Sequence, residues 1–119
     1  MQVAERAGHE LKKTVLELGG SDPFVILADA DLAVAARTAA EARLINSGQS
    51  CICAKRFIVV AAVADAFTTR FADELRSRPM GDPLARETVV GPQARADLRD
   101  DLHRQVEESI KRGATLLLG

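Results

Sequence analysis

The sequence contains little cysteine, no excess of charge of one sign and no long hydrophobic run. Its two cysteines, Cys51 and Cys53, are separated by one residue, so they cannot form the disulfide framework that stabilises small secreted domains. We therefore expect a reducing compartment, and the cytoplasm is the natural one. The 16 basic and 17 acidic residues give a net charge of -1. Without a basic field, neither nucleic acid nor an anionic membrane surface is an expected partner.

Hydrophobic residues make up 47% of the chain, but no apolar run approaches the roughly 20 residues that a membrane-spanning helix needs. The residues after Met1 also lack the charged and then apolar pattern of a signal peptide. At 119 residues, the chain is long enough for at most one small domain with a modest core. An enzyme that binds both a cofactor and a substrate would be crowded at this length.

The hydrophobic periodicity predicts helices that alternate with strands. Asp29 or Asp31 is expected to cap the second helix, because a carboxylate accepts hydrogen bonds from the free amides of a first turn. This order predicts an α/β fold with a largely parallel sheet. The first three expected helices cover Val3 to Leu11, the Ala-rich stretch to about Leu44, and Ala64 to Arg76. A fourth expected helix carries one apolar stripe, formed by Leu98, Leu102, Val106 and Ile110. The expected strands cover residues 14–16, 24–27, 57–60 and 114–118.

Two segments carry residues that suit covalent catalysis. Cys51 lies in a turn that contains Gly48, where a thiolate could act as a nucleophile, and Glu17 precedes the pair Gly19-Gly20, where a fixed carboxylate could act as a base. Simpler explanations exist for both. A Cys-x-Cys pair can be two small core residues, and a single acidic residue beside a strand can face solvent.

A metal site is not expected. Cys51, Cys53, His9 and His103 could nominally supply four ligands, but their spacing lacks the paired Cys-x-x-Cys or His-x-x-x-His arrangement typical of zinc sites. We interpret both histidines as residues on helix surfaces.

The order of several short motifs favours the catalytic interpretation. These motifs are Glu17-Leu18-Gly19-Gly20, Asn46-x-Gly48-Gln49-x-Cys51, Gly81-Asp82-Pro83, Thr88 and Gly91-Pro92. Together they resemble the central part of the aldehyde dehydrogenase family over essentially the whole chain. Ser21-Asp22-Pro23-Phe24 and the segment from Ala54 to Val59 are most similar to its succinate-semialdehyde dehydrogenase branch.

The resemblance implies a role for each matching residue. Cys51 matches the nucleophile that attacks an aldehyde, and its backbone amide matches a donor to the oxyanion. Glu17 matches the general base that activates water to hydrolyse the thioester. The carbonyl of Leu18 matches a contact to the nicotinamide amide of NAD or NADP. The reaction implied is oxidation of a small aldehyde to a carboxylic acid, while Asn46 and Gln49 are expected to shape the loop.

The resemblance also predicts what residues 1–119 lack. The family's asparagine oxyanion donor and its dinucleotide-binding domain lie upstream of Glu17, so we expect a single partial domain that lacks full activity alone. It would require a missing domain or form a homo-oligomer. Ile45 stands where many succinate-semialdehyde dehydrogenases carry an arginine for the substrate carboxylate, and Arg43 is out of register.

Two hypotheses of different classes remain. The chain is either the catalytic core of an aldehyde dehydrogenase, or a noncatalytic α/β module that associates with itself or with a partner through its exposed sheet edges. Cys53 adds the hypothesis of an oxidative switch, in which a strained disulfide to Cys51 blocks the nucleophile.

Overall fold

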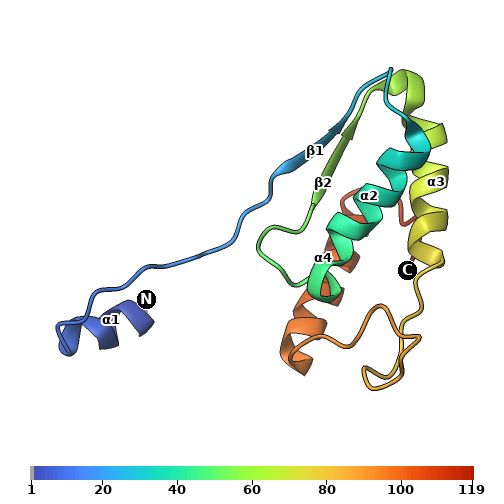
Figure 1. Cartoon of the computed structure of the whole chain (residues 1–119). Helices are drawn as coiled ribbons and strands as arrows, with labels where there is room; N and C mark the ends of the chain where they lie inside the picture. Colours follow the sequence, from blue (N-terminus) through green and yellow to red (C-terminus); the bar gives the residue numbers. More distant parts are fainter. Residues whose placement is uncertain (1) are drawn as a thin grey trace.

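The computed structural model describes residues 2–119 and contains four α-helices and one parallel pair of strands within that range (Figure 1). A 3-10 segment, η1, lies between α2 and β2, and a second, η2, lies between β2 and α3. The bounds are α1 Gln2–His9, β1 Pro23–Ile26, α2 Leu32–Leu44, η1 Ile45–Gly48, β2 Arg56–Val59, η2 Ala61–Val63, α3 Ala64–Arg76 and α4 Ala96–Lys111.

Strands β1 and β2 are joined through helix α2 and run parallel. Their register pairs Phe24 with Phe57 and Ile26 with Val59. Helices α2 and α3 pack against each other along this sheet (Figure 1). The core between them contains Ile26, Ala36, Ala39 and Phe67, all at most 2% exposed. The alanines let the helix approach closely, while Phe67 fills the space between the layers.

The first turn of α2 is capped by Asp31. Its Oδ1 accepts hydrogen bonds from the backbone N–H groups of Ala33, at 2.9 Å, and Val34, at 3.1 Å. These bonds satisfy donors that have no partner within the helix. The structure therefore selects Asp31 over Asp29 as the cap.

An N-terminal arm extends away from this βαβ body (Figure 1). It consists of α1 and residues 10–22, all of which are exposed after His9. The Cα radius of gyration is 17.7 Å, whereas a compact chain of this length has about 13–14 Å. The arm carries the Glu17-Leu18-Gly19-Gly20 motif.

The α/β class and the parallel pairing are confirmed, but two expected strands are wrong. Residues 14–16 and 114–118 form no strand. A strand requires a neighbouring strand to receive its backbone hydrogen bonds, and the sheet within residues 2–119 consists of β1 and β2 alone. The apolar pattern is present at both places, but the pairing partner is not.

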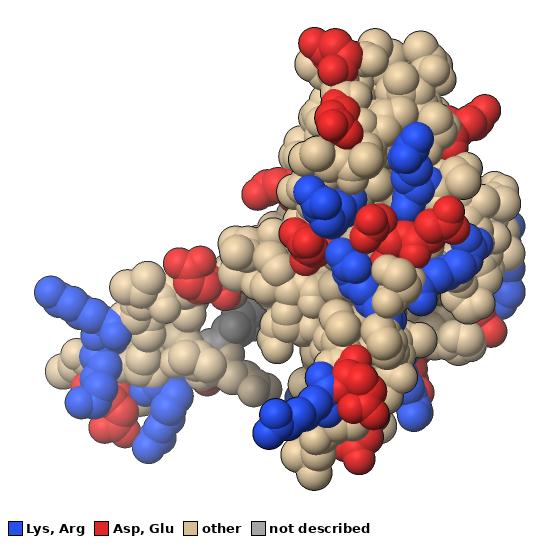
Figure 2. All heavy atoms as spheres, turned by 45° about the vertical axis from the view of Figure 1, so that its right-hand side comes forward, with Lys and Arg blue, Asp and Glu red and all other residues tan. Residues whose placement is uncertain are grey.

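Several apolar faces are exposed in this structure. Val25, Leu27, Ile58 and Val60, on or next to the two strands, are 40–56% exposed. The stripe of α4 is present as expected, but its four residues are 38–46% exposed, so it packs into no core here. In residues 2–119, no helix is both long and apolar enough to span a bilayer. Figure 2 shows acidic and basic side chains interspersed, in keeping with the small net charge.

Candidate active site

Cys51 lies in the connection between α2 and β2 and is an exposed, free cysteine. The chain enters this connection through three consecutive residues with left-handed backbone: Asn46 at φ 51°, Ser47 at φ 55° and Gly48 at φ 78°. Such a run is uncommon for residues other than glycine. Surrounding contacts must therefore hold the loop in this conformation.

Arg43, in the last turn of α2, supplies two of these contacts. Its guanidinium group donates to the carbonyl oxygen of Gly48 at 3.1 Å and to that of Ala54 at 3.2 Å. These carbonyls lie on either side of Cys51 in the sequence. One planar, permanently charged side chain thus closes the base of the loop.

A distant segment supports the other side of the loop. The Oγ of Ser47 accepts a hydrogen bond from the N–H of Gly91 at 3.0 Å. The Oε1 of Gln49 accepts one from the N–H of Ala94 at 2.8 Å, and its Nε2 donates to the carbonyl of Asn46 at 3.3 Å. The Cys51 motif and the Gly91-Pro92 motif therefore meet in space. Asn46 and Gln49 shape the loop, as expected.

The two cysteines occupy opposite environments. Cys53 is 2% exposed, and its thiol donates to the carbonyl oxygen of Ile45 at 3.2 Å. Cys51 is exposed. The interpretation of a small core cysteine therefore holds for Cys53 and not for Cys51.

The backbone N–H groups of Ser50, Cys51 and Ile52 have no hydrogen-bond acceptor among residues 2–119, whereas those of Cys53 and Ala54 are bonded to backbone carbonyls. A free N–H at the residue that carries the thiol can donate to an oxygen atom of a group bound to that sulfur. The loop thus presents an exposed thiol next to a backbone N–H that has no acceptor in residues 2–119.

Glu17 and Leu18 lie in the extended arm and are both exposed, Leu18 by 87%. Within the described part of the chain, no hydrogen bond or ion pair joins Glu17 to Cys51. The connection between their segments is made by Lys55, whose Nζ donates to the carbonyl oxygens of Gly20 at 2.7 Å and Cys51 at 2.9 Å. The sequence did not predict the role of Lys55, because its partners are backbone carbonyls. Every residue has such a carbonyl, so the residue types do not indicate which ones Lys55 binds.

Glycine at position 48 is required by both conformation and space. A Cβ atom there would lie 3.0 Å from Arg43 Nη2 and 3.4 Å from the Arg43 carbonyl oxygen, at a backbone φ of +78°. We expect Gly48→Ala to lower the free energy of unfolding by about 1–3 kcal/mol, measured by urea denaturation. Gly8→Ala is the matched control: no atom lies within 4 Å of its Cβ position in α1, so it should be neutral or stabilising. Equal midpoints for Gly48→Ala and the parent chain would contradict the requirement.

No group of three or more His, Cys, Asp or Glu side chains suited to a metal ion exists in residues 2–119. His9 is exposed at the end of α1, and His103 on α4 lies 3.5 Å from Glu107 and is 74% exposed. Both histidines are thus on helix surfaces, as their positions indicated.

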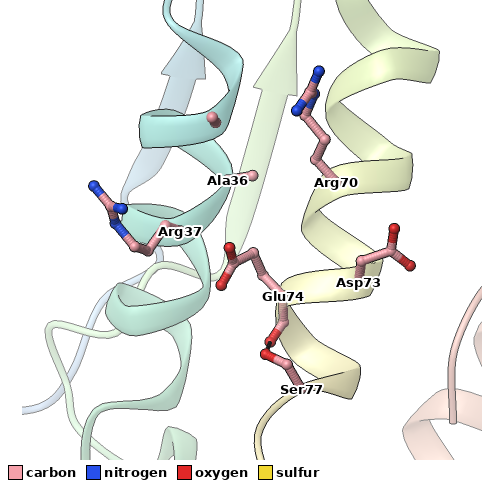
Figure 3. A pocket seen from close by; sticks show the side chains of 7 residues that line it. Ala36, Arg37, Arg70, Asp73, Glu74 and Ser77 are labelled. Carbon is pink, nitrogen blue, oxygen red and sulfur yellow. Dashed lines mark hydrogen bonds between the residues drawn. The ribbon is translucent and has the colours of Figure 1, made fainter.

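A pocket of about 360 Å³ lies between α2 and α3 (Figure 3). Its charged groups balance, with Arg37 and Arg70 against Asp73 and Glu74. Asp73 pairs with Arg76 at 2.7 Å, and Glu74 lies 3.4 Å from Arg78. None of Cys51, Glu17 and Leu18 lines this pocket. The candidate active site is instead the open surface around Cys51.

The chain belongs to the aldehyde dehydrogenase family, whose family model matches residues 1–119. A succinate semialdehyde dehydrogenase of Escherichia coli (strain K12), named with NAD(P)+, is 53% identical over 117 residues, which are 98% of this chain and 25% of that protein. An NADP+ succinate-semialdehyde dehydrogenase of Mycolicibacterium paratuberculosis is 50% identical over the same shares. The chain thus spans about a quarter of the length of these relatives.

The fold agrees with that assignment. The structure of a 3,6-anhydro-L-galactose dehydrogenase in complex with NADP superposes with a TM-score of 0.88 at 36% identity. The match covers 99% of this chain and 25% of that one. The family and the similarity to its succinate-semialdehyde dehydrogenases, both expected from the motifs, are thereby confirmed.

Proposed function

We propose that this chain carries the nucleophile and the general base of an NAD(P)-dependent aldehyde dehydrogenase. The observation that supports this most directly is the loop around Cys51, which combines an exposed thiol with a backbone N–H that has no acceptor in residues 2–119. Held by Arg43, Ser47 and Gln49, the loop is organised before any substrate arrives. Preorganised donors stabilise developing charge without reorganisation.

The chemistry follows from these groups. The thiolate of Cys51 forms a C–S bond to the aldehyde carbon, and the charge that develops on the aldehyde oxygen meets the N–H of Cys51. NAD(P)+, with its carboxamide held by the Leu18 carbonyl, would supply the hydride acceptor, and loss of a hydride from the same carbon would leave a thioester on Cys51. Glu17 takes a proton from water as the water attacks this thioester. The products are a carboxylic acid and the regenerated thiolate.

The residues around Leu18 fit a nicotinamide. The carbonyl oxygen of Leu18 accepts no hydrogen bond within residues 2–119 and lies in an exposed segment, so it is free to accept one from the carboxamide N–H. Gly20, two residues further on, is bonded to the same Lys55 that contacts Cys51. Leu18 thus lies on the arm that Lys55 joins to the Cys51 loop through the Gly20 carbonyl.

We propose succinate semialdehyde as the substrate, on the strength of the relatives' names. Its carboxylate needs a basic partner. Ile45, which is 43% exposed, offers none, and the guanidinium of Arg43 is engaged by the carbonyls of Gly48 and Ala54. Either a basic group from elsewhere in the assembled enzyme binds the carboxylate, or the preferred aldehyde is less polar.

A comparison of two aldehydes tests this proposal. In the enzyme assembled with a dinucleotide-binding domain, we expect NAD(P)H to form with succinate semialdehyde, with kcat/KM at least about tenfold higher than with butanal, which has the same carbon chain but no carboxylate. NAD(P)H absorbance provides the measurement, and the Escherichia coli relative serves as a positive control. No NAD(P)H with either aldehyde from this assembled enzyme, under conditions in which the relative turns over, would contradict the proposed function.

We further propose that the enzyme is cytoplasmic. We also propose that its exposed apolar faces are covered by more of the same protein, either in one chain or in a homo-oligomer. Val25 and Ile58 on the sheet, and Leu98 and Leu102 on α4, are 44–55% exposed. Water contact at so many apolar side chains is unfavourable. The same exposure supports the alternative of a noncatalytic, partner-bound module, which requires Cys51 to be unreactive toward aldehydes.

A further inference from the structure

We propose that Lys55 is a positioning residue that sets the placement of the Glu17-containing arm relative to the Cys51 loop; this inference rests on the proposed function. Its Nζ donates to the carbonyl oxygens of Gly20, at 2.7 Å, and Cys51, at 2.9 Å. An ammonium group has three donors, so one side chain can hold two backbone segments at once. The two carbonyls belong to residues more than thirty positions apart.

The bridge lies just beyond the end of the β1–β2 ladder. The first paired residues are Pro23 and Arg56, and proline has no N–H with which to continue the ladder. Beyond that point, two basic side chains hold the arm: Arg56 Nε donates to the carbonyl of Ser21 at 2.7 Å, and Lys55 donates to that of Gly20. Of these two, Lys55 alone also contacts the Cys51 loop.

The position of Glu17 depends on this bridge. Residues 10–22 are all exposed, so no buried side chain fixes the arm on the body. Glu17 is three residues from Gly20, which limits their Cα separation to about 11 Å in an extended chain. Fixing the Gly20 carbonyl beside that of Cys51 therefore restricts the volume that the Glu17 carboxylate can reach. A base acts only when it lies within hydrogen-bond reach of the water that it deprotonates.

The first test measures the tether without any catalysis. Glutamyl endopeptidase is added to the native chain, and cleavage after Glu17 is compared with cleavage after Glu10, which precedes the tethered segment. We expect Lys55→Met to accelerate cleavage after Glu17 about tenfold, because charge-assisted hydrogen bonds are lost, and to leave cleavage after Glu10 unchanged. Lys55→Arg should restore the slow rate. Lys111→Met, at the end of α4, is the matched control and should leave both rates unchanged.

The second test measures turnover. Lys55→Met is expected to lower kcat about tenfold and to change KM less than twofold, because it misplaces the base without removing a substrate contact. Lys55→Arg should recover most of the lost kcat. Faster cleavage after Glu17 with an unchanged kcat would overturn the catalytic part of the inference, and unchanged cleavage would overturn the tether. If the assembled parent enzyme gives no NAD(P)H, the proposed function fails, while the cleavage result still decides whether Lys55 holds the arm.

Discussion

Replacement of Cys51 by alanine in the assembled enzyme is expected to abolish aldehyde oxidation, with a loss of at least about 10⁴-fold in kcat/KM. Removal of a nucleophile eliminates the covalent route, so that only binding and electrostatic effects remain. NAD(P)H formation under substrate saturation measures the effect. Mass spectrometry provides a second measurement, since alanine cannot carry an acyl group and the peptide that contains residue 51 should gain no mass.

Cys53→Ser is the matched control for this variant. The serine hydroxyl can donate to the Ile45 carbonyl that now accepts from the Cys53 thiol at 3.2 Å, so the loop should keep its conformation. We expect kcat/KM to change less than about threefold, since Cys53 is buried and cannot reach a substrate. A large loss in Cys53→Ser together with residual turnover in Cys51→Ala would assign the nucleophile to Cys53 and refute our assignment.

Glu17→Gln is expected to lower kcat by about 10²–10⁴-fold, the range typical of general bases. Its carboxamide fills nearly the same space but cannot take a proton from water. Attack by Cys51 and hydride loss should continue, so the thioester should accumulate. Rapid mixing with succinate semialdehyde and NAD(P)+ should then give a burst of NAD(P)H, and the Cys51 peptide should carry one succinyl group.

The carboxylate of Glu10 provides the control on the same arm. It is paired with Arg6 at 3.0 Å on the surface, and exposed pairs of this kind contribute less than about 1 kcal/mol. Glu10→Gln should therefore leave both kcat and the acyl-enzyme level unchanged. If Glu17→Gln raises KM alone and no acylated Cys51 accumulates, the carboxylate of Glu17 serves binding and is not the base.

The local patterns that were predicted correctly depend on neighbouring residues in the chain. Helix α3 occupies the predicted range Ala64–Arg76, and α2 ends at Leu44 as expected. The parallel pairing of β1 and β2 follows from the helix between them. Asp31 caps α2 because a carboxylate at that place can reach the N–H groups of Ala33 and Val34. All these interactions span a few residues, so their signals are present in a short stretch of sequence.

The motifs by themselves also determined the family and named Cys51 and Glu17. Tertiary structure decided what surrounds them. It separated the exposed Cys51 from the buried Cys53, although the two have nearly the same sequence context. It joined Ser47 to Gly91 and Gln49 to Ala94, 44 and 45 residues apart. Residues 14–16 and 114–118 form no strand in the tertiary structure, because a strand exists only where a second strand accepts its hydrogen bonds. The contacts of Arg43 and Lys55 are to backbone carbonyls, which every residue possesses, so no pattern of side chains could have predicted which carbonyls they hold.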